Sequence, residues 1–241
     1  MRRSQTTAFI ILGVVLIMLF VILFISLGFN NDSEIGQILQ LQSKMSPIQA
    51  YIDDCLSQVV PAGVFQLSRN GGFIYWYEDT LLTEYEKIAY HSANKSPSLD
   101  MMKDELQRFT EESMMLCILN LGNTSYRFDY SKIDLQIEIG EEKINVEFNL
   151  PVTYSNGMSE VKNEKIKKTF PFRLKHLVGI KDQIVEIVEG TEYLDLDALS
   201  RFDVEVNVIP YDRNTTVYAI VDDQSLNEQN PLTFMLAVKE K

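Results

Sequence analysis

The side chains best suited to acid–base or nucleophilic chemistry are few and scattered in this chain. Its two histidines, His91 and His176, lie in separate regions. A Ser-His-Asp or Cys-His site needs a histidine held beside a nucleophile and an orienting group, and the local sequence supports neither arrangement. We therefore expect His176, which lies near a predicted helix start, to pack or cap. No catalytic residue is predicted.

Carboxylates are plentiful, with 34 Asp and Glu in 241 residues, so close acidic pairs arise by chance. Pairs such as Asp195 with Asp197, or Asp222 with Asp223, do not define a glycosidase site without a known separation. The stretch from Asp222 to Glu228 lacks the glycine register of an EF-hand, and we expect a turn there. The sequence predicts no metal site and no cofactor.

Cys55 and Cys117 are the only cysteines, and both fall in predicted helices. The chain has no CxxC motif and no cysteine–histidine cluster, so zinc and thiol-redox chemistry lack their ligands. Outside the cell a disulfide between the two would persist, and we expect one. The alternative is a pair of buried free thiols that act as small apolar side chains. Asp53 and Asp54, beside Cys55, are adjacent on a helix, diverge by about 100° and favour a solvated face.

The longest apolar stretch of the chain runs from Ala8 to Phe29 and precedes all of these side chains. Its 22 residues contain a single polar side chain, Ser26. As a helix it would span roughly 33 Å, close to the hydrocarbon core of a bilayer. Two arginines precede it and Asp32 and Glu34 follow it, which places the amino terminus in the cytoplasm and the remainder outside. The sequence predicts a single-pass cell-membrane protein held in lipid by residues 8–29.

Two processing routes remain open at this end. A secretory signal could be cut after Ser26 and Gly28, although the apolar core is longer than the usual 7 to 15 residues of a signal peptide. The opening RRSQTTAFIILG also resembles the class III signal of archaeal type IV pilin-like proteins. That resemblance implies cleavage between Ser4 and Gln5 and a remaining helix that assembles a filament. Phe9 stands where many such pilins carry a glutamate.

The rest of the chain predicts an α+β domain, a mainly antiparallel sheet packed on helices. We divide the chain into a membrane anchor (1–30), a stalk (31–46) and an extracytoplasmic domain (47–241). The last contains a helical part (47–122) and a strand-rich part (123–241).

Three helices are predicted from apolar periodicity and end signals. The first follows Ser46 as PIQAYIDDCLSQVV, with Ile48, Tyr51, Ile52, Cys55 and Val59 on one face. The second runs from Ser96-Pro97-Ser98 to about Leu121, with a stripe of Met102, Leu106, Phe109, Leu116 and Cys117. The third runs from Arg173 to Val188 and stops at Gly190. The two cysteine-bearing faces should meet, which clamps the first two helices together beside a sheet.

Strands are predicted from alternation. An aromatic strand is predicted from Phe73 to Tyr77, and we expect LLTEYEKIAYHS to pair back on it. Core or sheet packing is favoured there over a carbohydrate platform. Ile133 to Leu150 is a β-hairpin turning at Gly140. A turn at Asn156-Gly157 precedes a returning strand with Ile166, Phe170 and Phe172. Three last strands are centred on Val204–Val208, Val217–Val221 and Phe234–Val238. The lysines of the returning segment favour a protected edge strand over an anion site: Lys162, Lys165, Lys167 and Lys168.

Composition limits the partners. The residues predicted outside carry 20 Lys and Arg against 34 Asp and Glu, a net charge of about −14, which would repel phosphates and argues against nucleic acid. Four Asn-x-Ser/Thr sequons occur in predicted loops or boundaries, where glycans fit: Asn31, Asn94, Asn123 and Asn214.

The succession of the RRSQTTAFIILG start, PIQAYIDDCLSQVV leading to RNGGFIY, a helix ending in LCIL, and INVEFNLPVTY resembles single-pass membrane proteins of small-genome archaea. The similarity covers nearly the full length. It implies an archaeal envelope setting and pairing of Cys55 with Cys117, and it implies no known activity. We expect a non-catalytic role in envelope interaction or assembly, with a protein or glycan partner. The alternatives are a self-assembling pilin-like filament subunit cut before Gln5 and, more remotely, an extracytoplasmic hydrolase.

Overall fold

The computed structural model describes residues 47–75, 77–84, 86–119, 126–155, 160–162, 165–190, 196–227 and 230–239. The predicted membrane helix, the stalk, the processing site between Ser4 and Gln5, and the sequons at Asn31 and Asn123 lie outside these ranges. None of the helices inside them is long and apolar enough to cross a membrane.

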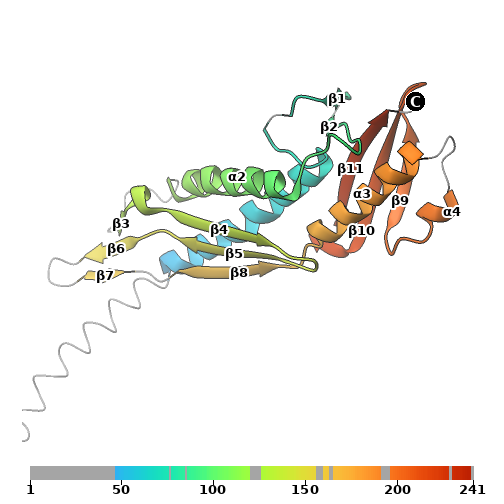
Figure 1. The fold of residues 1–241 in the computed structure, drawn as a ribbon. Helices are drawn as coiled ribbons and strands as arrows, with labels where there is room; N and C mark the ends of the chain where they lie inside the picture. The colour runs from blue at the N-terminus through green and yellow to red at the C-terminus, as the bar shows by residue number, and fades with distance from the viewer. Residues whose placement is uncertain are drawn as a thin grey trace, which may run out of the picture.

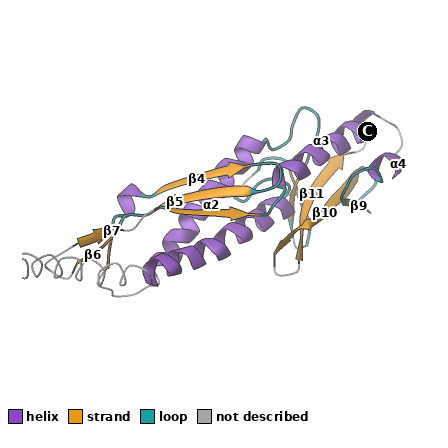
Figure 2. Ribbon diagram, turned by 90° about the horizontal axis from the view of Figure 1, so that it is seen from below, coloured by secondary structure: helices purple, strands orange, loops and turns teal. Residues whose placement is uncertain are grey.

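Helices and antiparallel sheets make up the described chain, an α+β fold as predicted (Figure 1, Figure 2). The first described helix covers residues 47–69 and is called helix 47–69. The elements after it are β1 (Thr80–Leu82), β2 (Lys87–Ala89), α2 (Leu99–Leu119), β3 (Tyr126–Phe128), the 3-10 turn Tyr130–Lys132, β4 (Asp134–Ile139), β5 (Ile144–Asn149), β6 (Val152–Ser155), β7 (Glu160–Lys162), β8 (Ile166–Phe170), α3 (Leu174–Gly190), α4 (Leu196–Leu199), β9 (Glu205–Pro210), β10 (Thr215–Asn227) and β11 (Asn230–Lys239).

One half of the fold, called the α2 half, contains α2 and the strands β3 to β8. β4, β5 and β8 form an antiparallel sheet in the order β4-β5-β8, and β3, β6 and β7 form a second in the order β3-β6-β7. Helix 47–69 and α2 run along the first sheet in opposite directions (Figure 1). Alternate residues of β4 and β5 are buried, and Ile139 pairs with Ile144 across the tight turn. The predicted hairpin is therefore confirmed.

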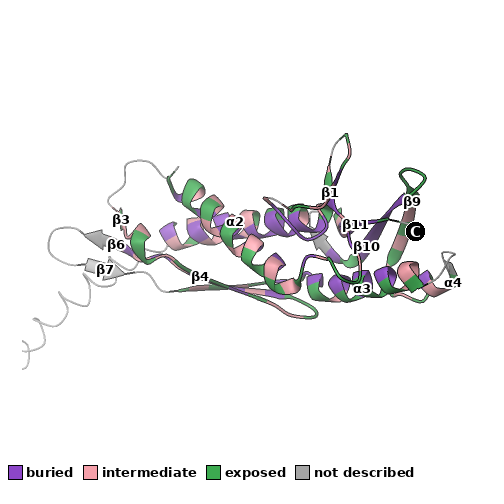
Figure 3. Ribbon diagram, turned by 45° about the horizontal axis from the view of Figure 1, so that its top comes forward, coloured by how far each residue is buried: buried purple, intermediate pink, exposed green. Residues whose placement is uncertain are grey.

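The other half, called the α3 half, is a three-stranded antiparallel sheet in the order β11-β10-β9, with α3 against β10 and β11. The small β1–β2 hairpin joins this sheet through a single parallel bridge between Tyr90 and Ala237. Burial is continuous between the halves: one cluster of buried apolar side chains includes Leu56, Phe148, Leu174 and Phe234 (Figure 3). The two halves therefore share a core.

Helix 47–69 is longer than its predicted form, because it continues nine residues beyond Val60. Pro61 lies inside it and costs about 3 kcal/mol in a helix interior. Val60, Val64 and Leu67 are fully buried on the continuing face. Burying three such side chains contributes about 1.5 to 3 kcal/mol each, which outweighs the proline.

The predicted aromatic strand from Phe73 to Tyr77 is wrong. Gly71 and Gly72 end helix 47–69 with φ of 78° and 102°, a left-handed backbone that suits glycine. The next backbone N–H groups, those of Ile74 and Tyr75, both donate to Oε2 of Glu105 in α2, at 2.9 Å. These groups therefore pair with a side chain, and the 80–89 segment pairs with itself as β1 and β2.

Two further expectations are corrected. The turn expected from Asp222 is the continuation of β10 to Asn227, with a register shift between Asp222 and Leu226. Leu116, expected in the buried stripe of α2, is 66% exposed. The buried residues of α2 recur every four positions, so their stripe winds by about 40° at each step and has turned away from Leu116 near the helix end: Met102, Leu106, Thr110, Met114 and Ile118.

The lysine-rich segment reaches from Lys162 at the end of β7 into β8, and β8 lies at the edge of the β4-β5-β8 sheet as predicted. Lys165 and Lys167 are exposed and pair with Glu147 of the neighbouring strand, at 2.9 and 3.0 Å. Lys168 points to the opposite face and lies 2.7 Å from Oδ2 of Asp53 in helix 47–69. These lysines therefore hold the edge strand to its neighbours.

Candidate functional site

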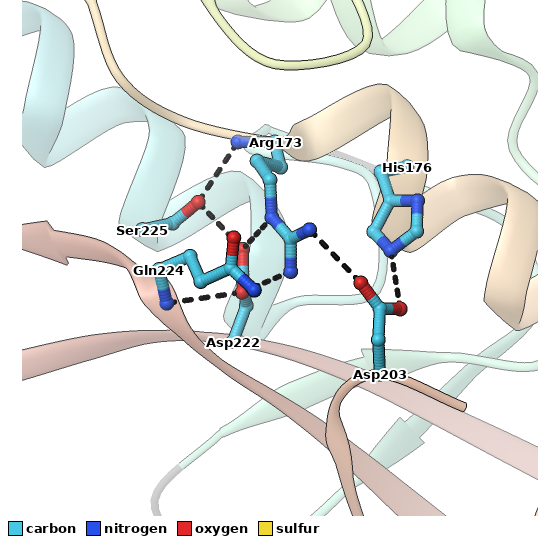
Figure 4. A network of polar contacts seen from close by, with 6 residues as sticks. All are labelled: Arg173, His176, Asp203, Asp222, Gln224 and Ser225. Carbon is cyan, nitrogen blue, oxygen red and sulfur yellow. Dashed lines mark hydrogen bonds and ion pairs between the residues drawn. The ribbon is translucent and has the colours of Figure 1, made fainter. Parts of the chain in front are cut away.

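A buried ion pair lies where β8 passes into α3 (Figure 4). The guanidinium of Arg173 donates from Nη2 to Oδ1 of Asp222 at 2.6 Å and from Nε to Oδ2 at 3.1 Å. The side chains are 7% and 1% exposed. This two-point geometry is the strongest form of carboxylate pairing that an arginine makes.

Asp222 is fully engaged in this pocket. Ser225 Oγ donates to Oδ2 at 2.6 Å, and the backbone N–H of Gln224 donates to Oδ1 at 3.1 Å. Burial alone would raise the pKa of Asp222, but the hydrogen bonds from Arg173, Ser225 and Gln224 outweigh it and hold the pKa below its ordinary value. The carboxylate is therefore kept charged.

The pair extends to the surface through Asp203. Arg173 Nη1 donates to Oδ2 of Asp203 at 3.0 Å, and Nε2 of His176 lies 2.8 Å from the other oxygen. Hydrogen bonds from Arg173 first, and then from His176, lower the pKa of Asp203. His176 therefore pairs with a carboxylate beside the start of α3, and its ring is 30% exposed.

This network ties segments together and does not assemble a nucleophile. The hydroxyl of Ser225 donates to Asp222 and accepts from the backbone N–H of Arg173 at 2.9 Å, whereas His176 is bonded to Asp203. A serine nucleophile needs its hydroxyl on a base such as histidine. The arrangement instead clamps together the start of α3, Asp203 two residues before β9, and the irregular part of β10.

The sequence does not predict this pair, because the stretch from Asp222 to Glu228 has the composition of a turn. One signal was present: Arg173 is a cation between the apolar Phe172 and Leu174 at a helix start. A charge in that setting calls for a buried partner.

The second histidine, His91, is 2% exposed. Its Nε2 lies 3.0 Å from the carbonyl oxygen of Gly71, and its Nδ1 has no hydrogen-bond partner among the described residues. Burial first, and then the charge of Lys181, lower its pKa from 6.5 to about 3, against the opposing effect of the Gly71 carbonyl. His91 is therefore a neutral core residue.

A groove of about 780 Å³ runs between α2 and the outer face of the β4-β5-β8 sheet. It is polar, because the alternation that buries one face of β4 and β5 turns their polar side chains outward. Its polar lining is Lys103, Gln107, Asp134, Gln136, Glu138, Asn145, Glu147, Lys167, Lys168 and Thr169, and its apolar lining is Leu135, Ile137 and Val146.

The strand register arranges the groove side chains in rows across the sheet. One row contains Glu138, Asn145 and Thr169: Thr169 Oγ1 donates to Oδ1 of Asn145 at 3.0 Å, and Asn145 Nδ2 lies 3.5 Å from Oε2 of Glu138. The next row contains Gln136, Glu147 and Lys167. Hydrogen bonds from Lys165 and then Lys167 lower the pKa of Glu147. Donors and acceptors thus alternate along a groove with charged and amide walls.

Tyr75 and Tyr77, two of the three aromatic residues that could form a carbohydrate platform, each have a ring face in contact with another side chain. Tyr75 lies beneath the guanidinium of Arg108, 4.3 Å from the ring centroid, and donates its hydroxyl to Glu112 at 2.6 Å. Burial and the Glu112 hydrogen bond raise the pKa of Tyr75 to about 12. Tyr77 stacks on Phe73, with ring centroids 5.9 Å apart. Trp76 lies outside the described residues.

The cysteines come together as expected, forming a disulfide between helix 47–69 and α2 with Cα atoms 6.3 Å apart. Tyr51 supports the same contact by donating its hydroxyl to the carbonyl oxygen of Cys117 at 2.9 Å. The two described sequon asparagines, Asn94 and Asn214, are exposed in loops between elements. Of the other acidic residues, Asp195 lies outside the described ranges, and Asp197 is exposed in α4. Within those ranges no group of three or more His, Cys, Asp or Glu side chains lies close enough to hold a metal ion.

Comparisons of the chain with protein-family models, curated proteins and solved structures returned no match.

Proposed function

We propose that this chain is a single-pass membrane-anchored extracytoplasmic protein with a non-catalytic role in envelope interaction or assembly, and that the groove beside α2 is its ligand surface. The observation that carries the proposal is the rows of acidic, amide and lysine side chains on one outward sheet face. Donors and acceptors at this density suit a ligand rich in peptide or hydroxyl groups, such as a protein segment or a glycan.

We favour binding over catalysis because the side chains that could transfer protons are held in structural contacts. Asp222 is held charged by Arg173, and His91 is buried against a backbone carbonyl. His176 is bonded to Asp203. Each of these groups already has a structural contact. The charge of the chain argues against nucleic acid as the partner.

The groove is tested by photo-crosslinking in native membranes. A photoreactive phenylalanine replaces Gln136, which is exposed in the groove, and as a matched control replaces Glu186, which is exposed on α3. We expect a discrete adduct only from position 136, and its loss when Thr169→Arg fills the same groove. Equal labelling at both positions, or none at 136, would contradict the proposal. Sensitivity of the adduct to periodate would identify a glycan.

The second candidate is a pilin-like filament subunit processed before Gln5. It is favoured by helix 47–69, one face of which lies on an antiparallel sheet while the chain before it carries the apolar residues 8–29. An adduct ladder at multiples of the chain mass would support this candidate over binding of another molecule.

A further inference from the structure

The last part of α2 exposes an apolar surface that the fold does not use. Met115, Leu116 and Leu119 are 38%, 66% and 61% exposed. On the inner side of the same turns, Met114 and Ile118 are buried in the core. The helix end is therefore apolar nearly all round, a pattern typical of a helix surrounded by apolar material.

This surface lies at the end of the molecule where the chain enters the domain. Helix 47–69 and α2 are antiparallel, so the end of α2 lies beside the start of helix 47–69 (Figure 1, Figure 3). The Tyr51 hydrogen bond to the Cys117 carbonyl and the Cys55–Cys117 disulfide fix this arrangement. The 17 residues 30–46 separate this end from the apolar residues 8–29. Even fully extended they reach only about 60 Å.

The side chains of this surface favour contact with lipid acyl chains over contact with charged lipid headgroups. The last turn of α2 has no basic residue, so it lacks the cations that attract anionic membranes. Flexible leucine and methionine side chains instead suit the boundary between headgroups and acyl chains.

We propose that Met115, Leu116 and Leu119 rest in the outer interface of the bilayer that holds residues 8–29. This inference deepens the proposed function and rests on its membrane anchor. It fixes the orientation of the domain: the end of α2 lies on the membrane, and the β1–β2 hairpin and the turn between β9 and β10 lie far from it.

The contact is tested with the full chain in phosphatidylcholine liposomes, with and without brominated acyl chains that quench tryptophan. Trp76, the single tryptophan, is changed to phenylalanine. One variant then carries Leu119→Trp and the control carries Leu82→Trp, because Leu82 is 64% exposed in the β1–β2 hairpin. Flotation of the liposomes reports the anchor separately.

We expect brominated lipid to reduce emission from position 119 at least twofold and to leave position 82 unchanged. Equal quenching at both positions, or none at 119 in protein that floats with the liposomes, would overturn the interface contact. Blue-shifted but unquenched emission at 119 would mean that residues 31–46 or a second copy cover the surface, which also overturns it. If the chain fails to float, the anchor itself is wrong, and this inference fails with it.

Discussion

Arg173 stands immediately before α3, where the helix end already carries a partial positive charge. A cation there is unfavourable by itself, and burial makes it more so. Asp222 and Asp203 reverse the balance by accepting hydrogen bonds from all three guanidinium nitrogens. Arg173 and Asp222, both buried charges, therefore each have a charged partner on another element of the fold.

Removing one member of the Arg173–Asp222 pair should strongly destabilise the fold. We expect Asp222→Asn to lower the free energy of unfolding by about 3 to 5 kcal/mol, because it leaves Arg173 buried without its main counter-charge. Because folding lowers the pKa of Asp222, its contribution is present above its ordinary value of 3.8 and is lost as pH falls through the folded value. Denaturant titration measures both effects. Asp203→Asn, at an exposed carboxylate, should cost less than about 1 kcal/mol; an equal cost for both would contradict this account.

His91 should make the free energy of unfolding depend on pH in a higher pH range than Asp222 does. Its folded pKa is about 3 against an ordinary 6.5, so the unfolded chain binds a proton that the folded chain excludes. Stability from this residue is complete above 6.5 and is lost as pH falls toward 3. Between about pH 7.5 and pH 5 we expect wild type to lose about 2 kcal/mol more than His91→Phe.

Equilibrium unfolding at the two pH values measures that difference. Thr110→Val provides the control, since Thr110 also has a buried oxygen without a partner in the described chain but does not titrate. It should keep the wild-type pH dependence. A His91→Phe variant with the same dependence as wild type would count against a neutral buried imidazole.

At the scale of elements, predictability followed periodicity. The β4–β5 hairpin and α3 were predicted because each buries one face, and burial imposes a period of 2 or 3.6 on the sequence. The strand predicted at Phe73–Tyr77 does not form, because Glu105 accepts hydrogen bonds from the backbone N–H groups of Ile74 and Tyr75. Glu105 is 31 and 30 residues away from them in the sequence. The burial of Asp222 was not predicted because its partner Arg173 is 49 residues away in the sequence. The groove residues of β4 were predictable as outward-facing, but the groove itself depends on the packing of α2.

The bridge between helix 47–69 and α2 should stabilise the fold strongly. Replacing Cys55 and Cys117 together with alanine removes a cross-link across 62 residues. On the chain-entropy model we expect a loss of roughly 4 kcal/mol in the free energy of unfolding. Chemical denaturation measures it, and reduced wild type should match the variant. An unchanged midpoint would show that packing alone holds the two helices together.

At the scale of the whole molecule, the α2 half and the α3 half share one core, and helix 47–69 contributes to both. A domain whose first described element is a long helix, preceded in the sequence by the apolar residues 8–29, suits either an anchored protein or a filament subunit. The two differ in the first four residues.

Intact-mass measurement of protein from native membranes separates them. We expect a mass that begins at Met1 or lacks only that methionine, because the proposed anchor needs no cleavage. A mass that begins at Gln5 would favour the filament subunit. Reduction should add about two mass units, as expected for one disulfide.

The Cys55–Cys117 disulfide also has a mechanical consequence. It lies only eight residues after residue 47, about two helical turns from the point where the chain enters the domain. Tension applied through the N-terminal segment would cross a covalent bond to α2 before it could peel helix 47–69 from the sheet. The force is then shared by two antiparallel helices and must shear their packing together, instead of separating one helix turn by turn. An oxidised domain should therefore withstand a pull on its N-terminal segment that unfolds the reduced one.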